Sequence, residues 1–339
     1  MMQVLRDVFY VIYSFLKMYM YGGFALLRQI LETHMREEQL LHTGYVAIVT
    51  GGSEGIGFEV SRGLVSKNVH VVIGSRCIEE GKHAVAKIRE EYPNAKVDWL
   101  CLDLSSLKSV QEFTYSFLAM GLPLHILVNN AGIMFAPYNE TEDGLEEHFQ
   151  VNYLSHFYLT LLLLDLLKDS GADNSYSRII NVSSVVHKVG SLDIDNLCKR
   201  HENWWEYSPH AAYSDSKLAV TVASFMLAKK LKEEKSKVTV NVVHPGIVRT
   251  RLYRHVHWCI KWLLDIVAIL CYKTPETAAD TVLYLALSNS LEGDTGCYYD
   301  NSHKTRPHDT SHDRVLQEKL WHRSCEIIEH LTQTELKHK

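Results

Sequence analysis

Short apolar runs alternate with amphipathic stretches of helix length from Tyr45 onward. Runs rich in Val and Ile predict six buried strands, at residues 45–50, 69–74, 96–104, 125–130, 178–184 and 238–243. Helix-length segments separate these strands, and parallel neighbours need such crossover connections. The pattern therefore predicts an α/β fold with a doubly wound parallel sheet in a single domain.

A different pattern occupies residues 1–43, which we expect to form a separate N-terminal segment. The stretch from Val8 to Leu27 is 20 residues long and holds one charge, Lys17. A helix rising about 1.5 Å per residue would just cross a hydrocarbon core about 30 Å thick, but a central Lys disfavours insertion. A membrane span, a helix lying among the headgroups and an extra buried helix stay open, and attachment to a membrane surface is favoured.

The composition is that of an ordinary globular protein. The 339 residues are 46% apolar and 22% charged, and the formal net charge is -5 without a long run of Lys or Arg. Nucleic acid is therefore not an expected partner. The seven cysteines are scattered and never form a CxxC pair. Neither a metal site nor a disulfide framework is predicted, and a reducing compartment is expected for the catalytic part of the chain.

The first predicted strand runs directly into a glycine-rich turn. Thr50, Gly51, Gly55 and Gly57 follow the pattern T-G-x-x-x-G-x-G, with a helical stretch immediately after it. Because glycines lack side chains, the backbone can turn tightly and approach a pyrophosphate held at the N-terminus of that helix. The turn therefore predicts a Rossmann-type dinucleotide site.

Two polar positions bear on which dinucleotide binds. Arg76 follows the second predicted strand, and no Asp or Glu stands at that strand end. A guanidinium there can pair with a 2′-phosphate, whereas a carboxylate would bind the 2′-hydroxyl, so NADP(H) is preferred and NAD(H) stays an alternative. Glu54 in the glycine turn argues against this preference. Asp103, after the third strand, either accepts from the adenine amino group or caps the next helix.

The stretch AAYSDSKLAV places Tyr213 and Lys217 four residues apart, on one face of a helix. An ammonium beside the phenol would lower its pKa from about 10 towards the range useful for acid–base catalysis. Ser184, at the end of the fifth predicted strand, could hold the reacting oxygen. Asn152 could hold a helix backbone open or position a water that relays protons. The four residues together predict proton exchange with an alcohol or a carbonyl.

These motifs resemble those of the short-chain dehydrogenase/reductase superfamily over about residues 44–305, the expected catalytic domain. Further signatures are NNAG at 129–132 and HPGIVRT at 244–250. The resemblance implies an NAD(P)-dependent alcohol/carbonyl oxidoreductase, allows a homodimer, and places Asn129 in support of the central sheet. It implies the catalytic residues Asn152, Ser184, Tyr213 and Lys217. It implies a cofactor site made of Thr50, Gly51, Ser53, Gly55, Ile56, Gly57, Arg76, Asp103, Asn130, Ala131, Gly132, Tyr213, Lys217, Pro245, Gly246, Val248 and Thr250.

A narrower resemblance is to the retinol-dehydrogenase-like branch of membrane-associated members. The 28 residues between Ser184 and Tyr213 carry GSLDIDNL, and further stretches such as YKTPETAA and LEGDTGCYY are similar to members associated with polyprenol oxidation and dolichal reduction. The resemblance implies a hydrophobic lipid alcohol or aldehyde as substrate, and attachment to the endoplasmic reticulum or to lipid droplets. A retinoid, steroid or fatty aldehyde substrate stays an alternative, as does a regulator that binds cofactor without turnover.

The end of the predicted catalytic domain has its own pattern. Residues 251–273 are rich in Trp, Leu and Ile, which predicts either a lid that rests on a membrane or a helix facing the core. The WWEY stretch at 204–207 either lines the entrance or anchors a loop. Thr274 and Pro275 are typical of a helix start. Residues 306–339 are expected to form a C-terminal helix and a frayed tail.

Overall fold

The computed structural model describes residues 2–31, 40–198, 206–248 and 272–333. Within these ranges one sheet of eight strands has the order β3-β2-β1-β4-β5-β6-β7-β8. All neighbours pair in parallel except β7 and β8. The strands are β1 (Val46–Thr50), β2 (His70–Ser75), β3 (Val97–Cys101), β4 (Ile126–Asn129), β5 (Ser177–Val182), β6 (Val238–His244), β7 (Cys297–Asp300) and β8 (His303–Thr305).

The chain direction across the sheet reverses beside β1. From β1 the chain moves outward to β2 and β3 on one side, and then returns to β4 on the other side of β1. In open α/β sheets ligands bind outside the carboxyl ends of the strands at such a switch point. Thr50 and Asn129 end the two strands that flank it, so the fold itself selects this edge for the functional site.

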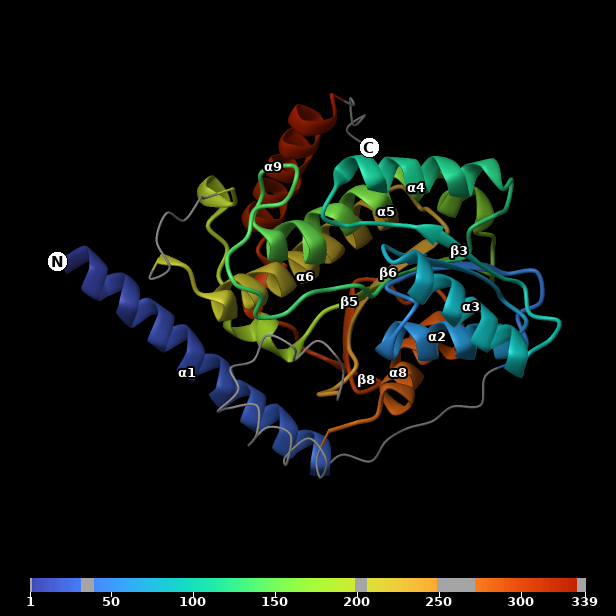
Figure 1. The fold of residues 1–339 in the computed structure, drawn as a ribbon, viewed down its shortest axis with the longest axis horizontal. Coiled ribbons are helices and arrows are strands. Elements are labelled where there is room, and N and C mark those ends of the chain that lie inside the picture. Colours follow the sequence, from blue (N-terminus) through green and yellow to red (C-terminus); the bar gives the residue numbers. More distant parts are fainter. Residues whose placement is uncertain (1, 32–39, 199–205, 249–271, 334–339) are drawn as a thin grey trace.

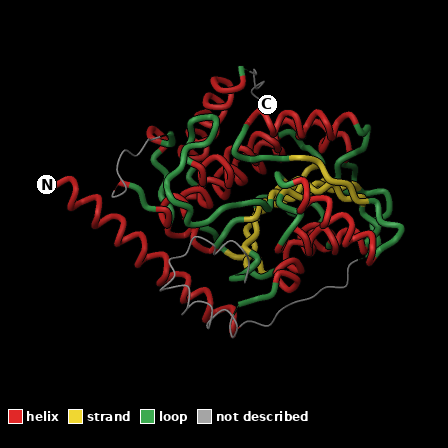
Figure 2. The backbone as a smooth tube through the Cα atoms, in the orientation of Figure 1, coloured by secondary structure: helices red, strands yellow, loops and turns green. Residues whose placement is uncertain are grey.

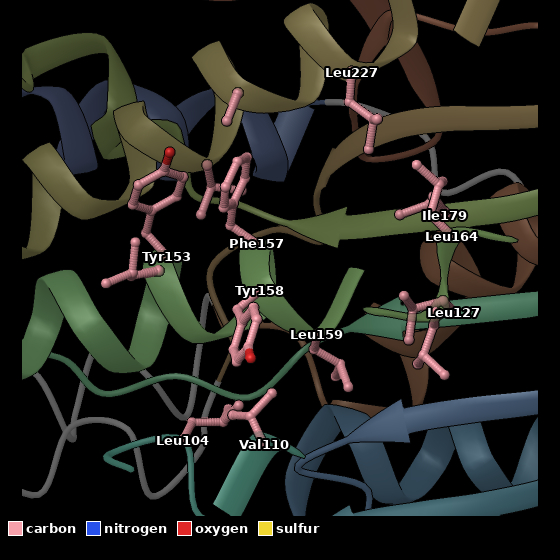
Figure 3. Close-up of a cluster of buried hydrophobic side chains, with 14 of the residues drawn as sticks. Leu104, Val110, Leu127, Tyr153, Phe157, Tyr158, Leu159, Leu164, Ile179 and Leu227 are labelled. Atoms are coloured by element: carbon pink, nitrogen blue, oxygen red, sulfur yellow. The ribbon is translucent and has the colours of Figure 1, made fainter. Parts of the chain in front are cut away.

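Helices cover both faces of the sheet, as Figure 2 shows. One face packs against α2 (Gly55–Ser66), α3 (Ile78–Glu91) and α8 (Pro275–Leu287), and the other against α4 (Leu107–Ala119), α5 (Ser155–Ser170), α6 (Pro209–Glu233) and α9 (Arg314–Thr332). Along β1, Val46 and Ile48 join the α4–α9 core, whereas Ala47 and Val49 join the opposite one. A strand buried on both faces reads as an uninterrupted apolar run, as observed in the sequence. Figure 3 shows part of the α4–α9 core.

The helices that position the site start at local signals in the sequence. The Ser208 side chain accepts a hydrogen bond from the Ala211 amide at the start of α6, where Pro209 takes the first helical position. Thr274 and Pro275 do the same at the start of α8, as the sequence predicts. These caps satisfy amide groups that otherwise lack a partner in the first turn.

All six strands expected from the sequence are present, with ends displaced by three residues or fewer. The apolar pattern does not predict β7 and β8, because CYYD and HKT are short and contain no Val, Ile or Leu. Parallel pairing with β6 holds β7 in place. The expectation of a purely parallel sheet is therefore right for seven strands and wrong for β8, which turns back on β7.

Helix α1 (Met2–Leu31) lies outside the two helical layers, along one side of the molecule (Figure 1). Of the helices that the structure describes, none combines the length and the apolar character needed to cross a membrane.

The C-terminal helix α9 is part of the core rather than an appendage. Trp321 is 3% exposed and meets the Phe157 ring of α5 edge-on, with ring centroids 4.9 Å apart. Nearby, the Tyr153 and Ser324 hydroxyls share a hydrogen bond of 2.7 Å. Tyr153 lies beside Asn152, so α9 supports the segment that carries a candidate catalytic residue.

Truncating this contact should destabilise the whole domain. We expect Trp321→Ala to lower the free energy of unfolding by about 3–5 kcal/mol, because it removes a large buried side chain and leaves a cavity. Val315→Ala on the same helix is the control: Val315 is 61% exposed, and its effect should stay within about 0.5 kcal/mol. Urea unfolding followed by circular dichroism measures both, and equal effects would contradict the assignment of α9 to the core.

Candidate active site

The glycine turn has the backbone geometry that the sequence predicts. Gly51 and Gly55 adopt positive φ angles of 63° and 57°, which residues with side chains rarely adopt. A Cβ atom at Gly57 would lie 2.2 Å from the Gly51 carbonyl oxygen and 2.5 Å from Asn130 Nδ2. The first turn of α2 thus packs against the loop with no space for a side chain, and its amide groups lie at the switch point, where they suit a pyrophosphate.

Thr50 and Asn130 join the glycine turn to the strand beside it. The buried Thr50 Oγ1 accepts from the Asn130 and Ala131 amides at 2.9 and 3.0 Å, and it lies 2.8 Å from His156 Nε2. Asn130 Nδ2 donates in return to the Thr50 carbonyl at 2.9 Å. Through this network Thr50 fixes the shape of the turn with a side chain that is fully buried.

The NNAG turn also ties the strands together. Asn129 Nδ2 donates to Asn181 Oδ1 at 2.7 Å and to Thr160 Oγ1 at 3.0 Å. These bonds join β4 to β5 and α5, which is the supporting role that the resemblance implies for Asn129. Gly132 follows the turn, and a Cβ there would lie 3.1 Å from Asn152 Oδ1 and 3.5 Å from Lys217 Nζ. The chain therefore passes close to both candidate catalytic groups at this point.

Other predicted cofactor residues line the same edge of the sheet. Ser53 and Ile56 are half-buried in the turn, and Arg76 is exposed directly after β2. Asp103 Oδ1 accepts from the Ser105 amide and hydroxyl at 2.9 and 2.7 Å, while Ser106 is the residue that caps α4. Pro245, Gly246 and Val248 are buried beyond β6. Thr250 lies outside the described residues, as do 251–271 of the predicted lid segment.

Asn152 lies in a π-helical turn, Phe149–Leu154, that precedes α5. Its Oδ1 accepts from the Ile133 amide at 2.8 Å, and its Nδ2 donates to the Ile133 carbonyl and to Ser216 Oγ at 3.0 and 2.9 Å. One carboxamide thus clamps the chain after NNAG to helix α6. Single π-helical turns are frequent at functional sites. The bonds of the carboxamide go to Ile133 and Ser216, so its predicted roles in holding a helix backbone open or positioning a water stay predictions.

Tyr213, Lys217 and Ser184 come together at the carboxyl end of β5. The Ser184 and Tyr213 side chains form a hydrogen bond. Lys217 Nζ donates to the Val182 carbonyl at 3.0 Å and lies 5.9 Å from the centre of the Tyr213 ring. The neighbouring Ser183 hydroxyl instead donates to the Lys217 carbonyl at 3.0 Å. The structure therefore places Ser184, and not Ser183, against the phenol.

The two titratable groups differ from the expectation in one respect. Burial raises the pKa of Tyr213 to about 12, although its hydrogen bond with Ser184 opposes the rise. Burial also lowers the pKa of Lys217 to about 8. The predicted lowering of the phenol pKa by the ammonium is thus wrong for this structure. Both groups have lost their water, and the ammonium bonds the Val182 carbonyl rather than the phenol oxygen.

His187 contacts the site through the backbone of Ser184, although the sequence does not single it out. Its Nε2 accepts from the His308 amide at 3.0 Å, which leaves Nδ1 to donate to the Ser184 carbonyl at 2.7 Å. Burial lowers the pKa of His187 to about 3, so the imidazole stays neutral. No local signal in the sequence distinguishes it, because the partner that fixes its tautomer, the His308 amide, lies on another segment.

The described part of the WWEY stretch anchors a loop. The buried Tyr207 hydroxyl donates to Glu146 Oε1 at 2.8 Å and lies 3.0 Å from His148 Nδ1. The His148 ring in turn lies 6.4 Å from the Tyr213 ring, centre to centre. Anchoring is therefore what Tyr207 does, while residues 204 and 205 lie outside the described ranges. The described residues hold no group of three or more His, Cys, Asp or Glu side chains suited to a metal ion.

The residues present fit a dinucleotide. The glycine turn has no room for side chains where α2 begins, and Tyr213, Lys217 and Ser184 stand at the end of β5, beyond the switch point. A hydroxyl pair of Ser and Tyr can bind one oxygen of an alcohol or carbonyl between them. A buried ammonium nearby can stabilise negative charge on that oxygen or on the phenol.

Comparison with known proteins gives the same family. A model of the short chain dehydrogenase family matches residues 45–195. The chain is 44% identical to polyprenol dehydrogenase from Danio rerio, over 94% of this chain and 97% of that one. It is 39% identical to retinol dehydrogenase 12 from Homo sapiens, over 84% and 86%. The solved RhlG/NADP active-site complex from Pseudomonas aeruginosa is similar in structure, with a TM-score of 0.61 and 29% identity over 77% of this chain and 95% of that one.

These matches cover most of the chain and agree with the geometry of the glycine turn and of the Ser, Tyr and Lys side chains. The chain therefore belongs to the short-chain dehydrogenase/reductase family, in its retinol-dehydrogenase-like branch, and is an NAD(P)-dependent oxidoreductase.

Proposed function

We propose that this enzyme interconverts a long hydrophobic alcohol and its aldehyde, with polyprenol oxidation and dolichal reduction as the leading reactions. The observation that carries the proposal is the apolar wall around the candidate acid/base. Met134, Phe135, Val185 and Val186 form one buried cluster with Tyr213. Such a wall suits a hydrocarbon chain next to the reacting carbon. Relatives at 43–44% identity that carry the name polyprenol dehydrogenase support the same substrate class.

In the proposed mechanism the four polar side chains have separate roles. A bound nicotinamide would supply or accept the hydride. Ser184 binds the substrate oxygen and Tyr213 exchanges its proton with it, while the Lys217 ammonium offsets the negative charge that develops. Lys217 would also hold the nicotinamide ribose. Asn152 acts through the turn that it clamps, and so positions the chain beside Gly132.

Burial sets the resting state of this machinery. Because burial raises the pKa of Tyr213 to about 12, the phenol holds its proton at neutral pH. It is therefore ready to protonate a carbonyl oxygen, which is what aldehyde reduction requires. Oxidation in the same site needs that proton to be removed first, and the positive charge of an oxidised nicotinamide ring would favour its removal.

The N-terminal segment is proposed to attach the enzyme to a membrane surface, at the endoplasmic reticulum or at lipid droplets. Large apolar side chains of α1 are exposed at Phe9, Tyr10, Ile12, Tyr13, Leu16, Met20, Phe24, Leu27, Ile30 and Leu31. An apolar helix face of this kind suits the boundary between headgroups and acyl chains. In this proposal residues 1–43 attach, 44–305 carry the catalytic domain and 306–339 support it through α9.

The central prediction concerns Tyr213. We expect Tyr213→Phe to lower kcat for polyprenol and for dolichal by at least about a hundredfold, because general acid–base catalysis contributes on that scale. Cofactor binding should persist. Steady-state assays with purified enzyme, and quenching of protein fluorescence by NADPH, measure the two effects.

A substrate panel separates the alternatives within the same experiment. Wild-type enzyme is given polyprenol, all-trans-retinol, a steroid alcohol and a fatty alcohol. The proposal expects polyprenol to have the highest kcat/KM. A preference for retinol or a steroid would assign the substrate differently, and full activity of Tyr213→Phe would reject the mechanism.

Burial of Lys217 lowers the free energy of unfolding, and the enzyme keeps this cost because its function needs the buried ammonium. The folded pKa of about 8 lies below the ordinary 10.5, a difference worth about 3 kcal/mol. Below pH 8 the lysine is charged in the folded and unfolded states and the cost is fully present, whereas above pH 10.5 it is neutral in both states and the cost is gone.

We therefore expect Lys217→Met to abolish activity and yet raise the free energy of unfolding at pH 7 by about 1–3 kcal/mol, after loss of the bond to the Val182 carbonyl. The difference in the free energy of unfolding between Lys217→Met and wild type should shrink as the pH rises from 8 to 10.5. Denaturant unfolding across this range measures it. If Lys217→Met is less stable than wild type at pH 7, burial of the ammonium does not lower the free energy of unfolding and the prediction is wrong.

Cofactor preference is proposed to rest on Arg76. Replacement by Asp should shift the ratio of kcat/KM for NADPH over NADH towards NADH by about tenfold or more, because a carboxylate repels a 2′-phosphate and accepts from a 2′-hydroxyl. Lys82→Asp makes the same charge change at an exposed position of α3 and should leave the ratio alone. Equal ratios in the two variants would remove Arg76 from the site.

A further inference from the structure

Helix α1 has two different faces. Met18 is 5% exposed and Met20, two residues further on, is 54% exposed. The exposed residues recur at helical spacing along one side, from Phe9 to Leu31. The opposite side packs on α6 and on the short helix Val185–Val189 that follows Ser184. The inner face is therefore in contact with α6, which carries Tyr213, and with the short helix that Ser184 caps.

The inner face of α1 shares a buried cluster with the candidate acid/base. Met18 belongs to the same cluster as Tyr213, Phe135 and Val186, and Tyr19 packs against it. A residue near the middle of the hydrophobic N-terminal segment thus contributes to the apolar surroundings of the reacting group.

A row of aromatic rings connects α1 to the phenol. Tyr213 meets Phe135 edge-on with ring centroids 5.5 Å apart, and Phe135 lies 4.6 Å from His210. The His210 ring then lies 5.1 Å from Phe15 and 5.9 Å from Tyr19. Burial lowers the pKa of His210 to about 4, so this ring is neutral and extends the apolar surface.

The backbone at Phe135 is unusual for a large side chain. Its φ angle is 56°, in the left-handed region that costs a bulky residue free energy. The next amide, that of Ala136, donates to His148 Nε2 at 3.2 Å and helps to hold this conformation. The surrounding structure thus holds the Phe135 ring between Tyr213 and His210, where it separates the phenol from α1.

Polar contacts fix α1 in this position. Gln29 bonds both backbone groups of Ile247, accepting from the amide at 2.7 Å and donating to the carbonyl at 3.3 Å. Lys17 Nζ donates to the Val189 carbonyl at 3.3 Å, and Arg28 pairs with Asp300 at 3.6 Å. The two Gln29 bonds to Ile247 fix the position of α1 along its axis relative to the domain. A helix held only by lipid would not need such bonds. The helix therefore bridges the loop after Ser184 and the HPGIVRT loop.

We propose that the inner face of α1, at Met18 with Phe15 and Tyr19, is a wall of the substrate site and determines which alcohol chains the enzyme prefers. The inference rests on the proposed function only in that the substrate is a hydrophobic alcohol. A chain that reaches past Phe135 contacts α1, whereas a short alcohol ends before it. The same helix offers its outer face to lipid, so a membrane-borne alcohol meets the wall as it enters.

The experiment compares two methionines of one helix. Met18→Ala and Met20→Ala are purified as full-length enzymes and assayed with primary alcohols of increasing chain length, from butanol to hexadecanol, and with polyprenol. For Met18→Ala we expect kcat/KM of the long alcohols to fall by about tenfold relative to butanol, through KM, because side-chain contacts worth one or two methylenes are lost. Met20→Ala should keep the wild-type dependence on chain length.

Three further measurements exclude misfolding, a general loss of packing and a loss of membrane binding as causes of the effect. Thermal unfolding shows whether Met18→Ala is folded, and Met18→Leu, which conserves volume, should restore most of the preference for long chains. Flotation with phosphatidylcholine vesicles should give the same bound fraction for wild type and Met18→Ala, since the change lies on the inner face.

The outcomes separate this inference from the proposed function. If Met18→Ala and Met20→Ala both retain the wild-type dependence on chain length, or if Met18→Ala lowers all alcohols equally, α1 is not a wall of the site. If polyprenol is a poor substrate but the alkanol series still responds to Met18→Ala, the proposed substrate fails and the wall stands.

Discussion

The buried ammonium of Lys217 is the constraint on which the rest of the site depends. A lysine removed from water needs a partner, and here the partner is the Val182 carbonyl at the end of β5. That bond fixes α6 against the strand that leads into Ser184, and so brings Tyr213 to Ser184. Asn152 completes the arrangement, because it clamps the chain beside Lys217 to the same helix. Catalytic geometry and helix packing are thus one structure.

Much of the fold and site could be predicted because the signals are local. Six strands, the glycine turn and the i, i+4 pair on α6 each follow from a short stretch of sequence, and the order of the motifs predicts the family. The strands β7 and β8 carry no such signal, since β7 forms by pairing with β6 and β8 by pairing with β7. The π-helical turn at Asn152 and the bond from His187 to Ser184 depend on partners far along the chain. The direction in which the pKa of Tyr213 shifts depends on its burial. The spacing of Tyr213 and Lys217 in the sequence does not reveal that burial.

Helix α1 shows the same limit of sequence reasoning more clearly. Its composition predicts membrane attachment or a buried helix as alternatives, and the structure gives one helix with an exposed apolar face and a buried one. Met18 and Met20 are indistinguishable in the sequence, yet only Met18 lies in the cluster around Tyr213. Attachment and substrate recognition can therefore reside in one element, and a division of the chain into an anchor and a catalytic domain hides that overlap.

Titration of Lys217 shows whether its ammonium is buried as the structure has it. Competitive labelling of its amine with a small acylating reagent, quantified by mass spectrometry from pH 6 to pH 11, gives the pKa of this one group. We expect a pKa near 8, because the ammonium is buried beside Tyr213. A pKa at the ordinary 10.5 would mean that Lys217 is solvated. The buried bond from its ammonium to the Val182 carbonyl would then not hold α6 against β5.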